Sequence, residues 1–240
     1  TSQDRGACYV LFGSPNWASE TSFDTSTLDG QRGFVIFGEF FGDNLGSRVC
    51  AAGDLNGDGY DDLAVSAPGF DLTPLDDRGC VYVLFGGPNV GAGGVVPAAS
   101  ITGATGFRIY PPFRDPLYVT DVPQIAGVRD VNGDGFDDLA IGSPSRGQIE
   151  PVIPLGADST RQIAAADLNG DGLGDFVVCQ PDQNRVLVFM NQNGQFAMST
   201  ISVPYARDLV LEDMNGDGLR DLVVCTFIGP FPGVSVYPNL

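Results

Sequence analysis

The chain has 240 residues and a formal net charge of −18, from 30 acidic and 12 basic side chains. This charge argues against nucleic acid and anionic membranes as partners. Because the chain has no histidine, it lacks Ser-His-Asp and Cys-His nucleophilic systems and the usual zinc sites. No run of about 18 apolar residues is present, so no membrane insertion is expected.

Frequent glycine and proline, 33 and 17 residues, leave no amphipathic helical window of useful length. The first predicted strands lie in "ACYVLF" from Ala7 and "GFVIFG" from Gly33. Near copies follow further along the chain, in "CVYVLF" from Cys80 and "GFRIY" from Gly106. All four segments are short and rich in β-branched or aromatic residues, which is typical of strands. The sequence therefore predicts an all-β protein.

A nine-residue pattern, Asp-x-Asn-Gly-Asp-Gly-x-x-Asp, occurs four times and starts at Asp54, Asp130, Asp167 and Asp213. The starts are several tens of residues apart, and recurrence at such intervals is typical of solenoids and propellers. One such loop could be a polar hairpin turn, since Asn-Gly and Asp-Gly are common there. Four copies with the same polar residues argue against that alternative.

Each loop offers side-chain oxygens at positions 1, 3, 5 and 9 and a backbone carbonyl at position 7. Such a set suits Ca²⁺, which takes six to eight oxygens at about 2.3–2.6 Å, better than Mg²⁺, which demands octahedral geometry. The sequence therefore predicts four calcium sites. Their predicted ligands are Asp54, Asn56, Asp58, Tyr60 and Asp62; Asp130, Asn132, Asp134, Phe136 and Asp138; Asp167, Asn169, Asp171, Leu173 and Asp175; and Asp213, Asn215, Asp217, Leu219 and Asp221.

The EF-hand has a similar loop but requires Glu at position 12 and flanking helices. Position 12 is apolar in all four loops, being Val65, Ile141, Val178 and Val224. Strand-like segments such as "DLAVSAP" and "DFVVCQP" follow the loops instead. Each loop is thus expected to join two strands of a hairpin, with the ninth-position Asp beginning the second. The whole unit reads as four antiparallel strands, which predicts a propeller blade.

Residues 41–69 resemble an FG-GAP repeat, the unit of the integrin α-subunit β-propeller and of many bacterial surface proteins. Phe41-Gly42 supplies the FG, and Ser66-Ala67-Pro68 stands where the GAP would be. A second repeat keeps Gly142-Ser143-Pro144, whereas the last two keep only the metal loop. The resemblance implies one repeat domain over residues 1–240, whose units span 1–40 (partial), 41–113, 114–157, 158–204 and 205–240.

The resemblance also implies that calcium stiffens loops on one face of the propeller, while partners use other surfaces. We expect a secreted or cell-surface module for adhesion or ligand binding, with a protein or glycan as ligand and no catalytic activity. The alternatives are a non-catalytic accessory propeller of a carbohydrate-active enzyme, or a lectin. A fold so widely reused does not identify the ligand.

The sequence predicts different environments for two sets of aromatic residues. Phe37, Phe40 and Phe41 are expected to pack between blades. Trp17 lies in a polar loop, where it either packs under its own loop or presents its ring to a sugar or a protein.

The five cysteines are an odd number, so at least one is unpaired or bonds another chain. Cys179 and Cys225 each lie 12 residues after the first Asp of a loop, on strands where Cys packs well. Both are predicted to be buried free thiols.

Five segments are candidate third strands, at residues 7–12, 80–85, 147–155, 185–190 and 233–238, but there are only four metal hairpins. Residues 1–40 are therefore expected to supply a third and a fourth strand without a hairpin of their own. Two arrangements follow. A ring of about four blades would leave residues 7–12 at an exposed edge, which invites pairing. Otherwise, further blades or self-association complete the propeller, and we favour this second arrangement.

Overall fold

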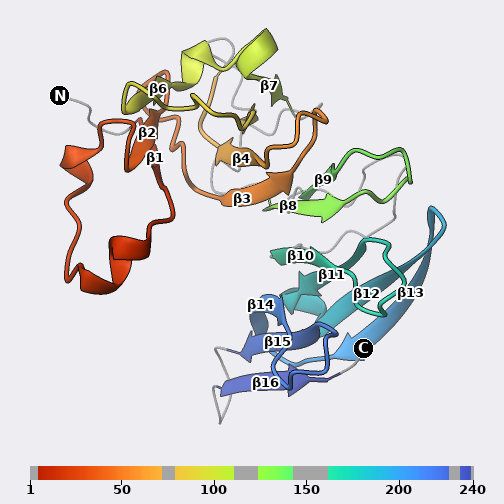
Figure 1. Ribbon diagram of the computed structural model, residues 1–240. Helices are drawn as coiled ribbons and strands as arrows, with labels where there is room; N and C mark the ends of the chain where they lie inside the picture. The colour runs from red at the N-terminus through yellow and green to blue at the C-terminus, as the bar shows by residue number, and fades with distance from the viewer. Residues whose placement is uncertain (1–4, 72–78, 111–123, 143–161, 227–232, 239–240) are drawn as a thin grey trace. The chain divides into compact units, whose positions relative to one another are not determined.

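The structure, a computed structural model, describes residues 5–71, 79–110, 124–142, 162–226 and 233–238. Regular structure in these ranges consists of β-strands and short 3₁₀ helices, so the predicted all-β class is confirmed (Figure 1). None of the helices within those ranges has the length and hydropathy needed to cross a membrane. The chain divides into two compact units: Thr1–Val49 with Tyr60–Val122 (unit 1), and Cys50–Gly59 with Pro123–Leu240 (unit 2). The repeat boundaries predicted from the sequence stay a prediction.

Two sheets contain the strands up to residue 110. The first has the order β1 (Ala7–Leu11), β2 (Gly33–Phe37) and β6 (Val95–Pro97). The second has the order β3 (Val49–Gly53), β4 (Asp62–Ala67), β5 (Cys80–Leu84) and β7 (Gly106–Ile109). Four 3₁₀ helices lie in the connections: η1 (Pro15–Ser19), η2 (Thr25–Thr27), η3 (Ala98–Ser100) and η4 (Gly103–Thr105).

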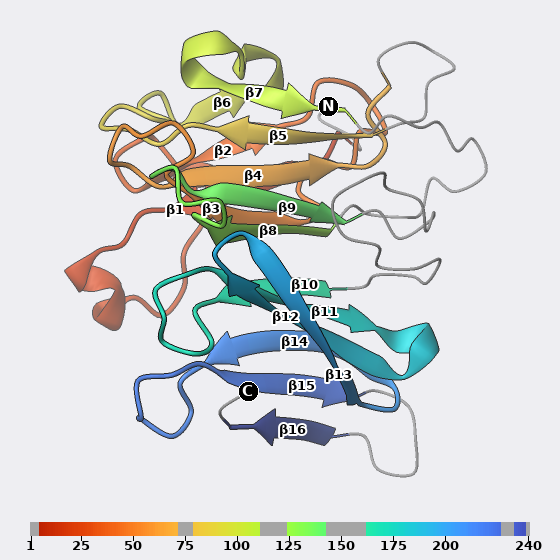
Figure 2. The same cartoon turned by 90° about the vertical axis from the view of Figure 1, so that its right-hand side faces the viewer.

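Three further sheets contain the described strands from residue 124 onward (Figure 2). The first is the pair β8 (Gln124–Arg129) and β9 (Asp138–Gly142). The next has the order β10 (Gln162–Ala166), β11 (Asp175–Gln180), β12 (Arg185–Gln192) and β13 (Gln195–Ser202), with η5 (Pro181–Gln183) between β11 and β12. The last has the order β14 (Ala206–Glu212), β15 (Asp221–Thr226) and β16 (Gly233–Tyr237).

The expected order of strands within a repeat is found. Second strands pair antiparallel with third strands in β4–β5, β11–β12 and β15–β16, and fourth strands β7 and β13 follow in two sheets. β1 and β2 form the expected antiparallel pair, and β1 and β16 belong to different sheets. The third strand expected at 147–155 lies outside the described residues, as do Ser143 and Pro144.

One pairing differs from the expected antiparallel blade. β6 joins β2 in parallel, with Val35 opposite Val95. The glycine-rich turn before β6 makes this possible, because the Gly94 carbonyl accepts a hydrogen bond from the Val35 N–H at 3.0 Å. A run of three residues after a Gly-Gly turn carries too little periodicity to be predicted as a strand.

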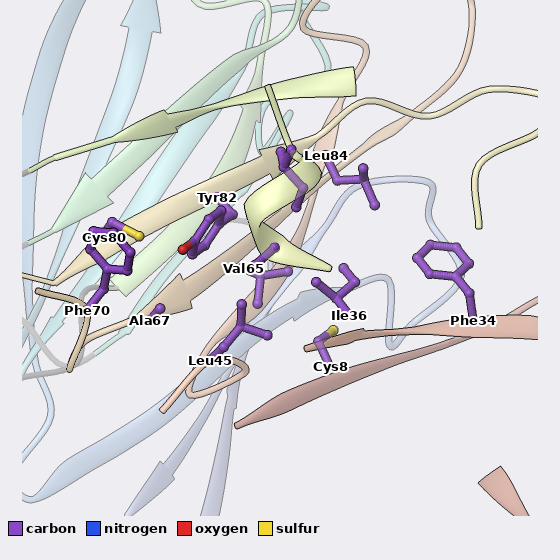
Figure 3. Packing of buried hydrophobic residues seen from close by; sticks show 12 residues of the cluster. Cys8, Phe34, Ile36, Leu45, Val65, Ala67, Phe70, Cys80, Tyr82 and Leu84 are labelled. Carbon is purple, nitrogen blue, oxygen red and sulfur yellow. The ribbon is translucent and has the colours of Figure 1, made fainter. Parts of the chain in front are cut away.

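The core of unit 1 lies between its two sheets. Cys8 and Ile36, from β1 and β2, belong to one buried cluster with Val65 of β4 and Tyr82 of β5 (Figure 3). Alternation along each strand puts these side chains on one face, as the pleat requires. The N-terminal strand pair is therefore packed face to face on the sheet that follows it.

In unit 2, β11 is buried on both faces. Val177 and Cys179 pack with Leu209 and Leu222 of the last sheet, whereas Phe176 on the opposite face packs with residues of β8 and β12. All six residues of β11 are buried. Sheets β8–β9, β10–β13 and β14–β16 are therefore stacked face to face in chain order.

First strands of successive sheets lie next to one another in unit 2. β10 lies beside both β8 and β14. β8 in turn approaches residues 51–52 so closely that a Cβ built on Gly127 would lie 2.5 Å from the Ala51 carbonyl oxygen. Only glycine fits this approach of two backbones.

We expect Gly127→Ala to destabilise unit 2 by about 1–3 kcal/mol, because the added methyl group must push the two strands apart. Urea unfolding followed by circular dichroism measures the change. Gly13→Ala is the matched control, since a Cβ at Gly13 meets no atom within 4 Å. Equal stability of the two variants would contradict the close approach.

Candidate functional site

The four predicted metal loops join the first and second strands of their sheets, as expected. β8–β9, β10–β11 and β14–β15 are antiparallel hairpins, and β3 neighbours β4 in the second sheet. The ninth-position aspartate is the first residue of the second strand in every case. All four position-12 residues lie within those second strands, so an EF-hand is excluded.

The aspartate at position 1 organises each loop by accepting backbone hydrogen bonds. In all four loops, its Oδ1 accepts from the N–H groups of positions 4 and 5 at 2.6–3.2 Å, and its Oδ2 accepts from position 6 at 2.8–2.9 Å. These donors, the position-6 glycine above all, hold the pKa of Asp54, Asp130 and Asp213 below its usual value. A negative charge is thereby favoured at the centre of these loops.

The glycines at positions 4 and 6 allow this arrangement. Their φ angles lie between +76° and +92° in all four loops. Other L-residues adopt such angles only at a cost. The glycines of the pattern therefore form the turn that directs successive N–H groups at the first aspartate.

Positions 3 and 5 form a second repeated contact. The Asn Oδ1 accepts from the N–H of position 5 at 2.9 Å in every loop. In three loops the Asn Nδ2 also donates to the position-5 carboxylate at 2.9–3.0 Å. Most of these side chains are exposed, so they can be reached from solvent.

The aspartate at position 9 ties the loop to the sheet. In three loops its Oδ2 accepts from the N–H of position 2 at 2.9 Å. Asp175 Oδ1 also accepts from Asn191 N–H, at the end of the third strand, at 2.7 Å. In unit 1, Asp62 Oδ1 accepts from Gly86 N–H at 2.8 Å. Burial raises the pKa of Asp175 although both N–H donors oppose the shift.

Neighbouring loops of unit 2 contact one another. Asp137 Oδ2 accepts from Asp54 N–H at 2.8 Å, and Asp137 N–H donates to the Asp54 carbonyl at 3.1 Å. Asn191 Nδ2 donates to the Val131 carbonyl at 3.2 Å. Sequence reasoning missed Asp137 and Asn191, because a single polar residue beside a motif carries no repeat signal.

A side-chain contact also repeats between these loops. The position-7 ring of Phe136 lies against Gly57 of the preceding loop, and Leu219 lies against Gly170 in the same way. The loops therefore gather at one end of the stacked first strands of unit 2.

The donor chemistry of the loops fits Ca²⁺. Every candidate ligand is a carboxylate, amide or carbonyl oxygen, and an ionised carboxylate can accept about four hydrogen bonds. The position-1 aspartate uses three in each loop, so acceptor capacity remains. Within the described ranges, however, no three acidic or cysteine side chains converge closely enough to form a metal centre by themselves.

The structure also shows the surroundings of the aromatic residues for which the sequence made predictions. Trp17 packs under its own loop: its Nε1 donates to the Phe12 carbonyl at 2.9 Å, and its ring meets Phe23 edge-on at 5.2 Å. The expected burial of Phe40 and Phe41 is wrong, because they are 54% and 75% exposed in a turn rather than in a strand.

None of the five cysteines forms a disulfide bond. Cys179 is buried as predicted, but Cys225 is exposed, so that prediction is wrong. The reason is the packing of the sheets: β11 is covered on both faces, whereas β15 has only its Leu222 and Val224 face covered.

Comparison with protein families identifies the repeats. An FG-GAP repeat matches residues 45–84 and 122–153, and an FG-GAP-like repeat matches residues 167–224. Together these matches cover more than half of the chain. The chain therefore belongs to the FG-GAP repeat family.

Curated relatives share the repeats over part of their length. The chain is similar to integrin alpha-4 of Xenopus laevis (33% identity over 122 residues) and integrin alpha-3 of Mus musculus (34% over 119 residues). It is also similar to a phosphatidylinositol-glycan-specific phospholipase D of Dictyostelium discoideum (30% over 132 residues). The matches include 46–50% of this chain but only 10–12% of each relative, so the chain spans about a tenth of their length.

Proposed function

We propose that the chain is a calcium-binding β-propeller module with an adhesive or ligand-binding role outside the cell. The observation that carries this proposal is the fourfold repetition of one loop geometry at the ends of the first strands. The integrin alpha relatives support the adhesive role and the extracellular location.

The propeller is supported by the packing within unit 2. Propeller blades are four-stranded sheets stacked face to face around their first strands. Sheets β8–β9, β10–β13 and β14–β16 stack in chain order, and β10 lies between β8 and β14. In the proposal, each sheet is one blade.

Calcium would be held by the side chains at positions 1, 3, 5 and 9 and the carbonyl at position 7. Ca²⁺ would supply two positive charges to a loop with three carboxylates. The aspartates at positions 1 and 9 are already fixed by hydrogen bonds. The exposed side chains at positions 3 and 5 would turn inward, and the loop would exchange their mutual hydrogen bond for coordination.

The ligand in this proposal is a protein or a glycan. With its loops committed to calcium, the module would present other surfaces to that ligand. The chain would have no catalytic activity of its own, because its clustered carboxylates serve the ions and it has no histidine.

A second candidate is a non-catalytic accessory propeller of an enzyme, including a carbohydrate-active enzyme. The phospholipase D relative favours it, because the matched repeats make up 12% of a protein named as an enzyme. Calcium-dependent binding of the chain to a glycan array would identify the module as a lectin. Calcium-dependent binding of the chain to an adhesion protein, and not to the array, would favour the integrin-like role.

Calorimetric titration of calcium into the chelator-treated protein tests the metal sites. We expect four binding events with dissociation constants on the order of 10⁻⁴–10⁻³ M, the range of extracellular modules. Asp138→Ala should remove one event and leave three, since each loop carries its own donors. Absence of binding heat, or loss of all four events in a folded variant, would contradict the proposal of four separate sites.

A further inference from the structure

Hydrogen bonds connect the second and third loops of the chain, which both lie in unit 2. In the second loop, the Asp138 Oδ2 at position 9 accepts from the Val131 N–H at 2.9 Å. The Val131 carbonyl accepts from the Asn191 Nδ2 at 3.2 Å. The Asn191 N–H donates to Oδ1 of Asp175, at position 9 of the third loop, at 2.7 Å. The two position-9 aspartates are therefore joined through Val131 and Asn191.

Asn191 lies in the interior of unit 2. Asn191 and Asp175 are 1% and 0% exposed. The Asn191 Nδ2 also donates to the Gly174 carbonyl at 3.3 Å, and its Oδ1 accepts from the Gly194 N–H at 2.8 Å. Hydrogen bonds between groups shielded from water are costly to leave unmade. The amide side chain is thus held in one orientation, in which it reaches from the third loop to the second.

The second sheet of the chain has the same anchor without this connection. Gly86 takes the place of Asn191, since each lies two residues after the third-strand residue that pairs with position 10. The Gly86 N–H donates to Asp62 Oδ1 at 2.8 Å, as the Asn191 N–H does to Asp175. Glycine has no side chain that could reach another loop. Anchoring position 9 therefore needs only the backbone, and the side chain of Asn191 adds the contact with the second loop.

We propose that Asn191 couples the calcium sites of the second and third loops, so that an ion in either loop raises the affinity of the other. This inference rests on the calcium sites proposed above. An ion in the second loop would fix Asp138 and, through it, Val131, whose carbonyl holds the Asn191 amide. The Asn191 N–H would then hold the Asp175 carboxylate in place for the next ion. The first ion thus lowers the ordering cost of the second site, and such coupling is reciprocal.

Coulomb interactions alone predict the opposite sign. Each loop has three ligand carboxylates and Ca²⁺ supplies two positive charges, so an occupied loop keeps one negative charge. Asp134→Ala at position 5 would empty the second loop and leave it with two ligand carboxylates. The more negative neighbour would attract an ion to the third loop more strongly. Weaker binding at the third loop of this variant would therefore report the hydrogen-bonded connection and not the charge.

A calcium titration followed by NMR of the position-6 glycine amides tests the coupling. Gly135 and Gly172 report on the second and third loops, because each N–H donates to the first aspartate of its own loop at 2.8 Å. Asp134→Ala should raise the dissociation constant of the third loop about 5–10-fold, at the lower end of the usual range for coupled sites. In an Asn191→Ala background, the same substitution should leave that constant unchanged or lower it. Asp171→Ala should weaken the second loop by the same factor, as reciprocity requires.

Gly194→Ala is the matched control for the Asn191 substitution. It perturbs the turn that the Asn191 Oδ1 supports, since the φ of Gly194 is +84°, but the added Cβ meets no atom within 4 Å and the Nδ2 contact stays. The coupling should survive this change. If Asp134→Ala leaves the third loop unchanged or strengthens it, the coupling is refuted while the calcium sites stand, and this measurement needs no Asn191 variant. An equal weakening in the Asn191→Ala background would refute the role of Asn191. Glycine amides that ignore calcium in every loop would overturn the proposed sites and the coupling with them.

Discussion

In calcium at about 10 mM, thermal unfolding is expected on the order of 10 °C or more above the midpoint in EDTA. An ion that binds only the native state adds RT ln(1 + [L]/Kd) per site. With dissociation constants on the order of 10⁻⁴–10⁻³ M, this is about 1.4–2.7 kcal/mol for each site. Three of the loops lie within unit 2. For a unit of this size, each kcal/mol added to the free energy of unfolding raises the midpoint by about 4 °C.

The same melt in magnesium is the control for simple charge screening. Magnesium dehydrates reluctantly and needs near-octahedral geometry, so its effect on the midpoint should be much smaller. Equal midpoints in calcium and EDTA would show that the loops are structural turns. Equal effects of calcium and magnesium would remove the case for a calcium-selective site.

Asp175→Ala should destabilise the protein by roughly 2–5 kcal/mol even without calcium, because two N–H groups lose their acceptor and burial makes each costly. Those groups belong to Leu168 and Asn191, at 2.9 and 2.7 Å from the carboxylate. Chemical denaturation in EDTA measures this loss. Calcium should then add less stability to the variant than to the parent protein, since one site is missing.

Asp171→Ala separates the two roles of the loop. Asp171 is exposed at position 5 of the same loop, and its hydrogen bonds are local. Its removal should cost little in EDTA, yet it should reduce the stabilisation by calcium as much as Asp175→Ala does. If both variants lost equal stability in EDTA, the buried anchoring of Asp175 would be refuted.

Much of the fold could be predicted because the loops repeat. Four copies of one pattern fixed the hairpins, and the short apolar segments after them gave the second and third strands. The parallel strand β6 could not be predicted, because its three residues follow a turn and pair through backbone groups rather than side chains. Its position depends on tertiary context.

The loop residues could be predicted, whereas the groups that anchor them could not. Asn191 lies 16 residues after Asp175 and meets it only because β12 returns beside β11. Cys225 was mispredicted for a related reason. Its position in the repeat equals that of Cys179, but burial depends on whether another sheet covers the face. Sequence periodicity identifies equivalent positions without showing which faces are covered.

The carboxylate of Asp175 connects three parts of one sheet: the loop, the start of β11 and the end of β12. A tensile force applied to that loop would therefore pass directly into the centre of the sheet instead of peeling the hairpin from its tip. With an ion in the loop, the same carboxylate would become the mechanical link between the ion and strands β11 and β12. In a module that holds cells or surfaces together, the supply of calcium would then set the load at which the sheet begins to yield.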